Sequence, residues 1–259
     1  MGGRGVALLT GVIALALVGV GGWWFLFGGS DPPPVSLEQA VTSLQATPAA
    51  TSAAARATPS VVAATIPSAT ASPAAAAPKS TGDVASRWVV DGSNSFVGYR
   101  MVEQLASIGA NTAVGRTSAV TGELRYDGGS VTALQVQADV RQLKSDDNRR
   151  DNFLRTQSLQ TSQFPEAKFV LTEPIAISVR PAEGAAMTTT ARGDLTLHGV
   201  TKRVDVPLEG KMANGKLVVV GSTRIALADY AISPPRAPVV LSVEDAGVME
   251  LSLVFAPEG

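Results

Sequence analysis

One stretch in the last third of the chain constrains its fold more than any other. In residues 193–197, Leu195 and Leu197 alternate with polar residues, and residues 204–208 repeat this pattern. A period of two in both halves indicates two strands, each with one buried face and one exposed face. Gly199 lies between them and can take the positive φ that a turn requires. The stretch therefore predicts a hairpin in an antiparallel sheet that packs on one face.

The same alternation recurs through residues 85–259, a length that suits one domain. The predicted strands are Arg87 to Asp91, Ser95 to Met101, Thr117 to Tyr126, Ser130 to Leu143, Ala167 to Thr172, Met187 to Leu197, Lys202 to Glu209, Lys216 to Ala228 and Val248 to Ala256. Asn214-Gly215 is a strong signal for a two-residue hairpin turn. Helical signals occur between Asp146 and about Leu159, after Ser145 as a cap. Many short strands with one buried face predict a barrel or a sandwich.

Two sequence motifs carry a family resemblance. The first is Gly193-Asp194-Leu195-Thr196-Leu197-His198-Gly199-Val200-Thr201-Lys202, and the second combines Leu143-Lys144-Ser145, Arg150-Asp151-Asn152-Phe153-Leu154, Phe164-Pro165 and Lys168-Phe169. In order and approximate spacing they resemble the YceI-like, lipid-binding family over roughly Trp88 to Phe255. One departure is Asn94-Ser95, where the family usually has a His-Ser pair. The resemblance implies an all-β, extended antiparallel barrel of about eight strands, similar to lipocalins, whose apolar interior accepts a long isoprenoid chain.

The candidate ligand-binding residues lie on the apolar phase of their strands and are expected to point inward. They are Val97, Tyr99, Val136, Ala138, Phe169, Leu195, Leu197 and Leu251. The resemblance implies a polyisoprenoid or an isoprenoid quinone as the bound lipid, and no other cofactor is expected. An eight-stranded interior is either just filled by side chains or able to hold one small ligand. The alternative is therefore a filled barrel that binds another protein.

The residues offer little for catalysis. The chain has no Cys and one His, His198, whereas a zinc site usually needs several such ligands. A Ser-His-Asp arrangement would have to use His198, and no nucleophile elbow is present. The 21 basic and 22 acidic residues are mixed without the basic stripe of a nucleic-acid binder. We therefore expect a binding protein, not an enzyme, with Arg150-Asp151 as either a structural ion pair or a polar contact at the ligand entrance.

The N-terminal third differs in composition from the barrel. Residues 1–28 contain the uncharged apolar run Val6 to Phe27, which is long enough to span a bilayer. Its bulky aromatic end fits an uncleaved anchor better than a cleaved signal peptide. Arg4 before the run and Asp31 after it predict a single-pass cell-membrane protein with an extracytoplasmic C-terminal domain. The oligomeric state is not predicted.

Residues 29–84 are rich in Ala, Thr, Ser and Pro. Such a segment buries too little apolar surface to offset its ordering entropy, so we expect a disordered stalk. Ser36 to Leu44 is the one stretch with a short helical pattern. The stalk is interpreted either as a spacer that holds the barrel away from the membrane or as an inert linker.

Overall fold

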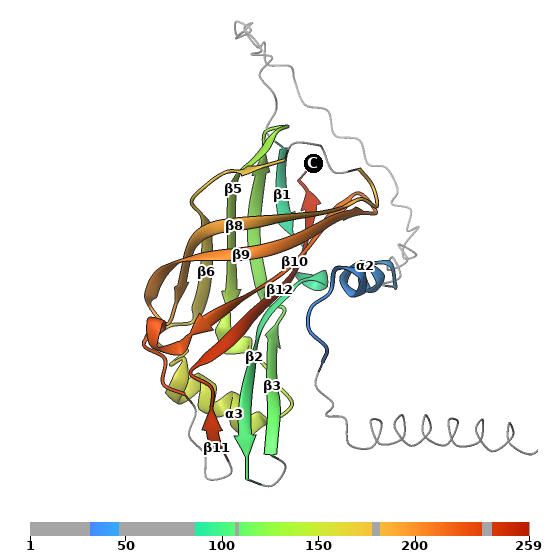
Figure 1. Ribbon diagram of the computed structural model, residues 1–259. Coiled ribbons are helices and arrows are strands. Elements are labelled where there is room, and N and C mark those ends of the chain that lie inside the picture. Colours follow the sequence, from blue (N-terminus) through green and yellow to red (C-terminus); the bar gives the residue numbers. More distant parts are fainter. Residues whose placement is uncertain (1–31, 47–85, 107–108, 178–181, 235–239, 259) are drawn as a thin grey trace, which may run out of the picture.

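The computed structural model of the protein describes residues 32–46, 86–106, 109–177, 182–234 and 240–258. These residues form one antiparallel β-barrel, with helix α3 at one end and the C-terminus at the other (Figure 1). The strands are β1 (Ser86–Val90), β2 (Phe96–Leu105), β3 (Gly109–Thr117), β4 (Val120–Tyr126), β5 (Ser130–Asp139), β6 (Glu166–Leu171), β7 (Ile175–Ala176), β8 (Ala186–Leu197), β9 (Val200–Ala213), β10 (Lys216–Ala226), β11 (Val240–Val243) and β12 (Ala246–Pro257).

Eight of these strands close a ring. Their order is β1-β4-β5-β6-β8-β9-β10-β12, and β12 returns to β1 through the register pair Val90↔Phe255. Closure leaves the ring without free edges, which protects it from pairing with other chains. The prediction of an all-β, closed antiparallel barrel is confirmed.

Strand β12 is long enough to pair with two strands in succession. Its C-terminal part pairs with β1, and its N-terminal part pairs with β2 through Leu251↔Val97. Between β1 and β2, the 3₁₀ turn Gly92–Asn94 bends the chain. Strand β3 pairs along the whole of β2, and the short β11 pairs with the other edge of β2. The sequence patterns predicted neither β3 nor β11.

The hairpin that anchored the sequence interpretation is present as β8 and β9. Its turn residues His198 and Gly199 have φ values of 51° and 74°. Two successive positive φ values give the type I′ turn, whose twist matches that of the flanking strands. Asn214 and Gly215 repeat this geometry between β9 and β10, with φ values of 53° and 70°. Both predicted turns are therefore confirmed. In the first turn, His198 is in the left-handed conformation, as is Gly199.

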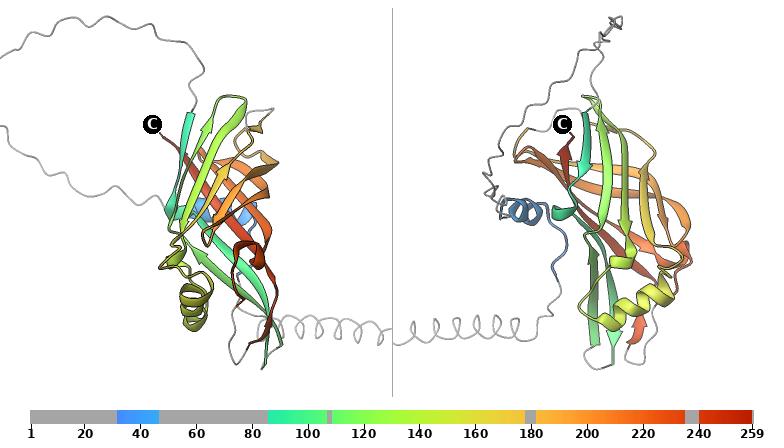
Figure 2. Two further views of the ribbon diagram at one scale, coloured as in Figure 1. Left: turned by 90° about the vertical axis from the view of Figure 1, so that its left-hand side faces the viewer. Right: turned by 180° about the vertical axis from the view of Figure 1, so that it is seen from behind.

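The predicted helical insertion is also confirmed. Helix α3 (Asn148–Phe153) continues into a π-helical turn (Leu154–Ser158) and lies across the end of the barrel (Figures 1 and 2). The predicted cap is wrong by two residues, because the side chain of Asp147, not of Ser145, accepts the backbone N–H of Arg149. The Ser145 hydroxyl instead donates to Asp151 at 2.7 Å.

The prediction of disorder throughout residues 29–84 is wrong for one stretch. Residues Leu37–Ala46 form helix α2, which packs on the outside of the barrel (Figure 1). Its buried residues Leu37, Val41 and Leu44 follow the i, i+4, i+7 spacing of one helix face. Helix α2 coincides with the short helical pattern that the sequence shows at Ser36 to Leu44.

The expected anchor, Val6 to Phe27, and the rest of the expected stalk, residues 47–84, lie outside the described residues. Among the helices that are described, none is both long and apolar enough to cross a membrane. The anchor and the domain boundaries at residues 28 and 84 therefore stay predictions.

Candidate ligand cavity

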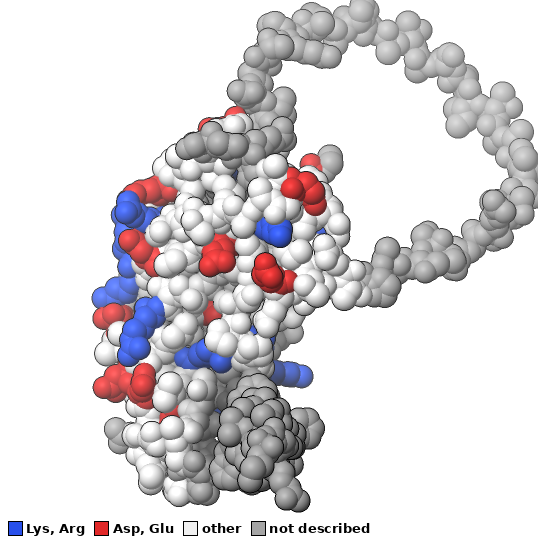
Figure 3. Space-filling model, turned by 45° about the vertical axis from the view of Figure 1, so that its right-hand side comes forward, with Lys and Arg blue, Asp and Glu red and all other residues white. Residues whose placement is uncertain are grey.

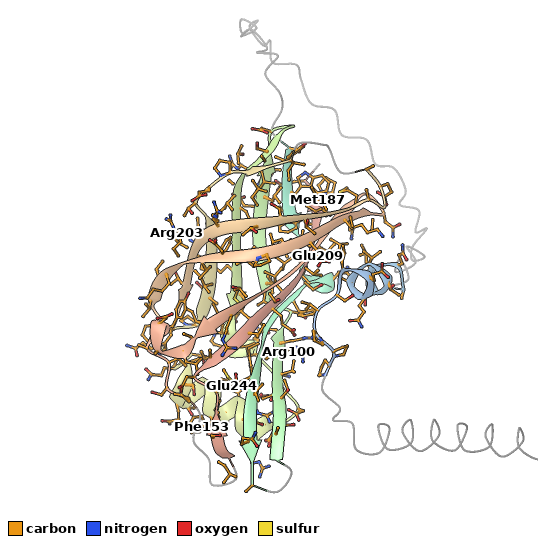
Figure 4. All side chains as sticks on the ribbon, viewed as in Figure 1. Arg100, Phe153, Met187, Arg203, Glu209 and Glu244 are labelled. Carbon is orange, nitrogen blue, oxygen red and sulfur yellow. The ribbon has the colours of Figure 1, made fainter. Side chains whose placement is uncertain are left out.

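The inward side chains of the barrel line a cavity of about 260 Å³. The cavity reaches from Met187, near the start of β8, to Leu154 in the π-helical turn beside α3. Figure 4 labels Met187 in the upper part of the barrel and Phe153, the neighbour of Leu154, in its lower part. A void that holds one water molecule needs only about 10–15 Å³. The interior is thus not filled by its own side chains, in contrast to the filled-barrel alternative.

All eight candidate ligand-binding residues line this cavity. They are Val97, Tyr99, Val136, Ala138, Phe169, Leu195, Leu197 and Leu251. Period two brings them together because residues of one phase share one face of a strand. Register then aligns them across strands, as Val136↔Phe169 and Phe169↔Leu195 show on β5, β6 and β8. Their contact with a ligand stays a prediction.

Two glycines allow the aromatic rings of the cavity to lie flat against the sheet. A Cβ atom on Gly115 would lie 2.3 Å from Cε1 of Tyr99, and one on Gly193 would lie 2.4 Å from Cζ of Phe169. Real Cβ atoms do not approach so closely, so each ring occupies the space of an absent side chain. The two rings therefore pack against the backbone of the neighbouring strands at these glycines.

The wall is apolar over most of its length, and a group of polar side chains lies at the α3 end. Tyr99 and Glu103 of β2, Arg150 of α3 and Ser158 line the cavity there. The Nη2 atom of Arg150 lies 2.8 Å from Oε1 of Glu103, which also accepts a hydrogen bond from Asn111 at 2.8 Å. The side chains of Arg150 and Glu103 are 15% and 5% exposed, so water screens this ion pair weakly.

Two buried hydroxyl groups lie at this end. Within the described residues, Oγ of Ser158 has no hydrogen-bond partner, and Oη of Tyr99 makes none of good geometry, although the Ser145 hydroxyl lies close to it. Burial raises the pKa of the Tyr99 phenol well above its usual value, so it remains a protonated donor at neutral pH. A buried polar group without a partner costs about 1–3 kcal/mol. This end of the cavity is therefore suited to a ligand with a polar group.

The Arg150-Asp151 motif resolves into two separate interactions. Arg150 pairs with Glu103 and with Asp146, whereas the Asp151 carboxylate accepts from the backbone N–H and the hydroxyl of Ser145, at 2.9 and 2.7 Å. The two residues do not pair with each other, so the interpretation as a mutual ion pair is wrong. Asp151 secures the start of α3, and Arg150 carries a positive charge to the cavity wall.

His198 occupies a structural position. Its Nδ1 lies 3.0 Å from the backbone oxygen of Tyr230, and its ring packs edge-on against Phe164 with 4.6 Å between centroids. Among the described residues, no group of three or more His, Cys, Asp or Glu side chains could hold a metal ion. These contacts fit a turn residue that fastens the hairpin to the chain after β10.

Sequence reasoning missed most of the polar end. Glu103 lies in the same phase as Tyr99 on β2, so extending the predicted strand beyond Met101 would have placed it inside. Ser158 lies in a π-helical turn and offered no comparable signal. On the outer surface, acidic and basic side chains are interspersed over the face in Figure 3, as in the pair Asp194–Arg203 at 3.1 Å.

The fold and the cavity together define a class: a closed antiparallel barrel with an apolar interior. The YceI-like domain model matches residues 88–255, which is more than half of the chain, so the protein belongs to the YceI-like family. A UPF0312 protein of Vibrio vulnificus is 26% identical over 159 residues, which cover 57% of this chain and 78% of the relative. A UPF0312 protein from Shewanella is 28% identical over 171 residues, which cover 62% of this chain and 84% of the relative.

Among solved structures, a polyisoprenoid-binding domain from Saccharophagus degradans has a similar fold. It superposes with a TM-score of 0.54, covering 66% of this chain and 98% of that domain, at 15% sequence identity. At this identity the likeness concerns the fold.

Proposed function

We propose that this protein binds one long-chain apolar lipid, an isoprenoid or similar molecule, inside its barrel. The observation that carries the proposal is the apolar cavity inside the barrel, lined from Met187 to Leu154. Ligand sites of this kind are apolar pockets with a few placed polar groups. The solved domain from Saccharophagus degradans, which is described as polyisoprenoid-binding, has the same fold and supports this ligand class.

The polar end suggests how the lipid is oriented. Ser158 carries a hydroxyl without a protein partner, Tyr99 carries one with no well-aligned partner, and Arg150 adds a positive charge beside them. A ligand oxygen could accept hydrogen bonds from these donors while the chain extends past Phe169 toward Met187. A polyisoprenoid alcohol and an isoprenoid quinone both have such an oxygen. We place the head of the lipid at the α3 end for this reason.

We also propose that the barrel is extracytoplasmic and anchored in the cell membrane by Val6 to Phe27. The support is the length of this uncharged run, its aromatic end and the flanking Arg4. A binding role, not a catalytic one, fits a cavity whose charged groups Arg150 and Glu103 are already paired. The protein would then hold a lipid outside the bilayer that supplies it.

Narrowing the cavity tests the proposal. Ala138 is 3% exposed and faces the cavity, whereas Ala133 on the same strand is exposed. Ala138→Trp should weaken capture of a tritiated long-chain polyprenol, or of a quinone with the same tail, at an unchanged melting temperature. Ala133→Trp is the matched control and should bind as the wild type does. If Ala138→Trp binds the probe normally, or loses stability in a barrel that never binds it, the proposal is wrong.

A further inference from the structure

The segment Pro32–Ala46 is fastened to the outside of the barrel at two places. The first is apolar: Leu37, Val41 and Leu44 of α2 are buried against strands β9, β10 and β12. Their partners are Ala213, Val218, Val220 and Val254. Val218 is 0% exposed and Val254 is 1% exposed, although both lie on the outer face of the barrel. Helix α2 thus covers an outward apolar patch.

The second place is polar and lies beside β2 and β3. The Glu250 carboxylate, 1% exposed, accepts from Arg100 at 3.1 Å and from Arg116 at 2.7 Å. Each arginine has a further N–H that reaches the N-terminal segment. Nη2 of Arg100 donates to the carbonyl oxygen of Pro32, and Nη2 of Arg116 donates to that of Pro33 at 3.1 Å. The proline carbonyls therefore complete a buried ion cluster of the barrel.

These contacts change the role expected for the Ala/Pro/Thr-rich stretch. Because Ala46 and Ser86 both belong to elements held on the barrel, residues 47–85 connect two points of one folded body. They do not separate the barrel from the apolar run. The link between that run and the barrel is instead residues 28–31, which precede the bound Pro32.

We propose that the segment Pro32–Ala46 holds the barrel directly against the bilayer, with the end formed by β2, β3 and β11 toward the lipid. This inference rests on the proposed anchoring by Val6 to Phe27. The five Cα–Cα steps from Phe27 to Pro32 span at most about 18 Å. The β2 side of the barrel is thus kept close to the membrane surface, and the long stretch 47–85 adds no distance.

The choice of this end follows from the path of the chain and from its exposed side chains. From α2 back to Pro32 the chain runs along β3 toward the α3 end (Figure 1). At that end Leu241 of β11 is 70% exposed and Val102 of the adjoining β2 is 39% exposed. These two apolar side chains would meet the acyl chains of a bilayer that lies against this end. The polar end of the cavity, at Tyr99 and Arg150, would then lie nearest to the bilayer.

Cleavage of the loop tests the clamp. A specific protease site is placed between residues 60 and 70 of the full chain, reconstituted in phosphatidylcholine vesicles. After cleavage, the barrel should still sediment with the vesicles through the contacts of residues 32–46. Val41→Asp should release the cut barrel, and Thr42→Asp, on the exposed side of α2, should not. Release of the wild-type barrel on cutting, or retention of the Val41→Asp barrel, would overturn the clamp.

The same assay separates the clamp from the anchor. If the uncut chain does not sediment with vesicles, the anchoring itself fails, and the inference fails with it. If the uncut chain sediments and the cut barrel leaves, only the clamp is wrong.

The orientation has its own test, because the chain contains no cysteine and accepts single labels. Leu241→Cys and Val170→Cys, each carrying an environment-sensitive fluorophore, are compared in vesicles with doxyl-labelled lipid. Val170 is 36% exposed on the outer face of β6 and is the control. We expect lipid quenching at position 241 only. Equal quenching at both positions, or none at position 241, would overturn the orientation.

Discussion

Arg150 of α3 and Glu103 of β2 form an ion pair at the polar end of the cavity, with 2.8 Å between Nη2 and Oε1. The two residues are 47 positions apart in sequence, so their pairing fixes the helical insertion on the barrel wall. Both side chains are largely withdrawn from water. The pair therefore fastens α3 to the barrel and places its charges on the cavity wall.

Removing one partner of this pair should lower the unfolding free energy more than removing both. Arg150→Met leaves the buried Glu103 carboxylate without its cation, which we expect to cost on the order of 3 kcal/mol of unfolding free energy. Adding Glu103→Gln to this variant should restore much of the loss, because the uncompensated charge is gone. Chemical denaturation of the four members of the cycle gives the coupling. Strictly additive effects would contradict the pairing.

Position 115 should not tolerate even the methyl side chain of alanine. Because a Cβ there would lie 2.3 Å from the ring of Tyr99, Gly115→Ala must displace that ring. Such overpacking typically costs about 1–3 kcal/mol, and the displaced ring should also weaken polyprenol capture. In a Tyr99→Leu background the same substitution should be nearly neutral, as measured by thermal unfolding. An equal cost in both backgrounds would show that the ring is not the obstacle.

Because Tyr99 is buried, the unfolding free energy should fall at alkaline pH. Burial penalises the phenolate and so raises the pKa of Tyr99 above the usual value for a tyrosine, about 10. The unfolded chain therefore ionises first, so the stability contributed by the neutral phenol is complete below about pH 10 and is lost as the pH rises further. Tyr99→Phe should reduce the loss of unfolding free energy above pH 10. Burial also raises the pKa of Tyr230, so part of the pH dependence of stability should remain in this variant. An unchanged pH profile would contradict the burial.

The face assignment of β8 can be tested with a single charge. Leu195 is 3% exposed and faces the cavity, whereas Thr190 on the same strand is exposed. Leu195→Asp buries an unpaired carboxylate, which is costly enough to unfold a marginally stable domain. Thr190→Asp should melt within a few degrees of the wild type. Similar melting temperatures for both variants would reverse the assignment.

The barrel and its interior could be predicted because strand periodicity is a local property. The inward direction of Leu195, Leu197 and Val136 follows from the alternation of apolar and polar residues around each of them. The strand register within the ring then aligns them. The docking of α2 could not be predicted in this way. Its three apolar residues are a weak local signal until the outward patch around Val218 supplies a partner.

Long-range ionic contacts were hidden for the same reason. Nothing near Glu250 in the sequence indicates that Arg100 and Arg116 will enclose it. Likewise, the proximity of Arg150 to Asp151 in sequence favoured a mutual pair, although tertiary structure gave each residue a different partner. Sequence patterns show which faces are apolar, but they do not show which distant charges will meet.

Native mass spectrometry of the protein purified from its own cells, followed by lipid extraction, tests the central claim most directly. The account predicts one apolar chain per barrel, released on unfolding and absent from Ala138→Trp but present in Ala133→Trp. Its head should be a hydroxyl, carbonyl or phosphate oxygen that Tyr99 and Ser158 can bond. A wild-type barrel that carries no lipid from its native membrane, and takes up none when polyprenol or quinone is supplied, would contradict it.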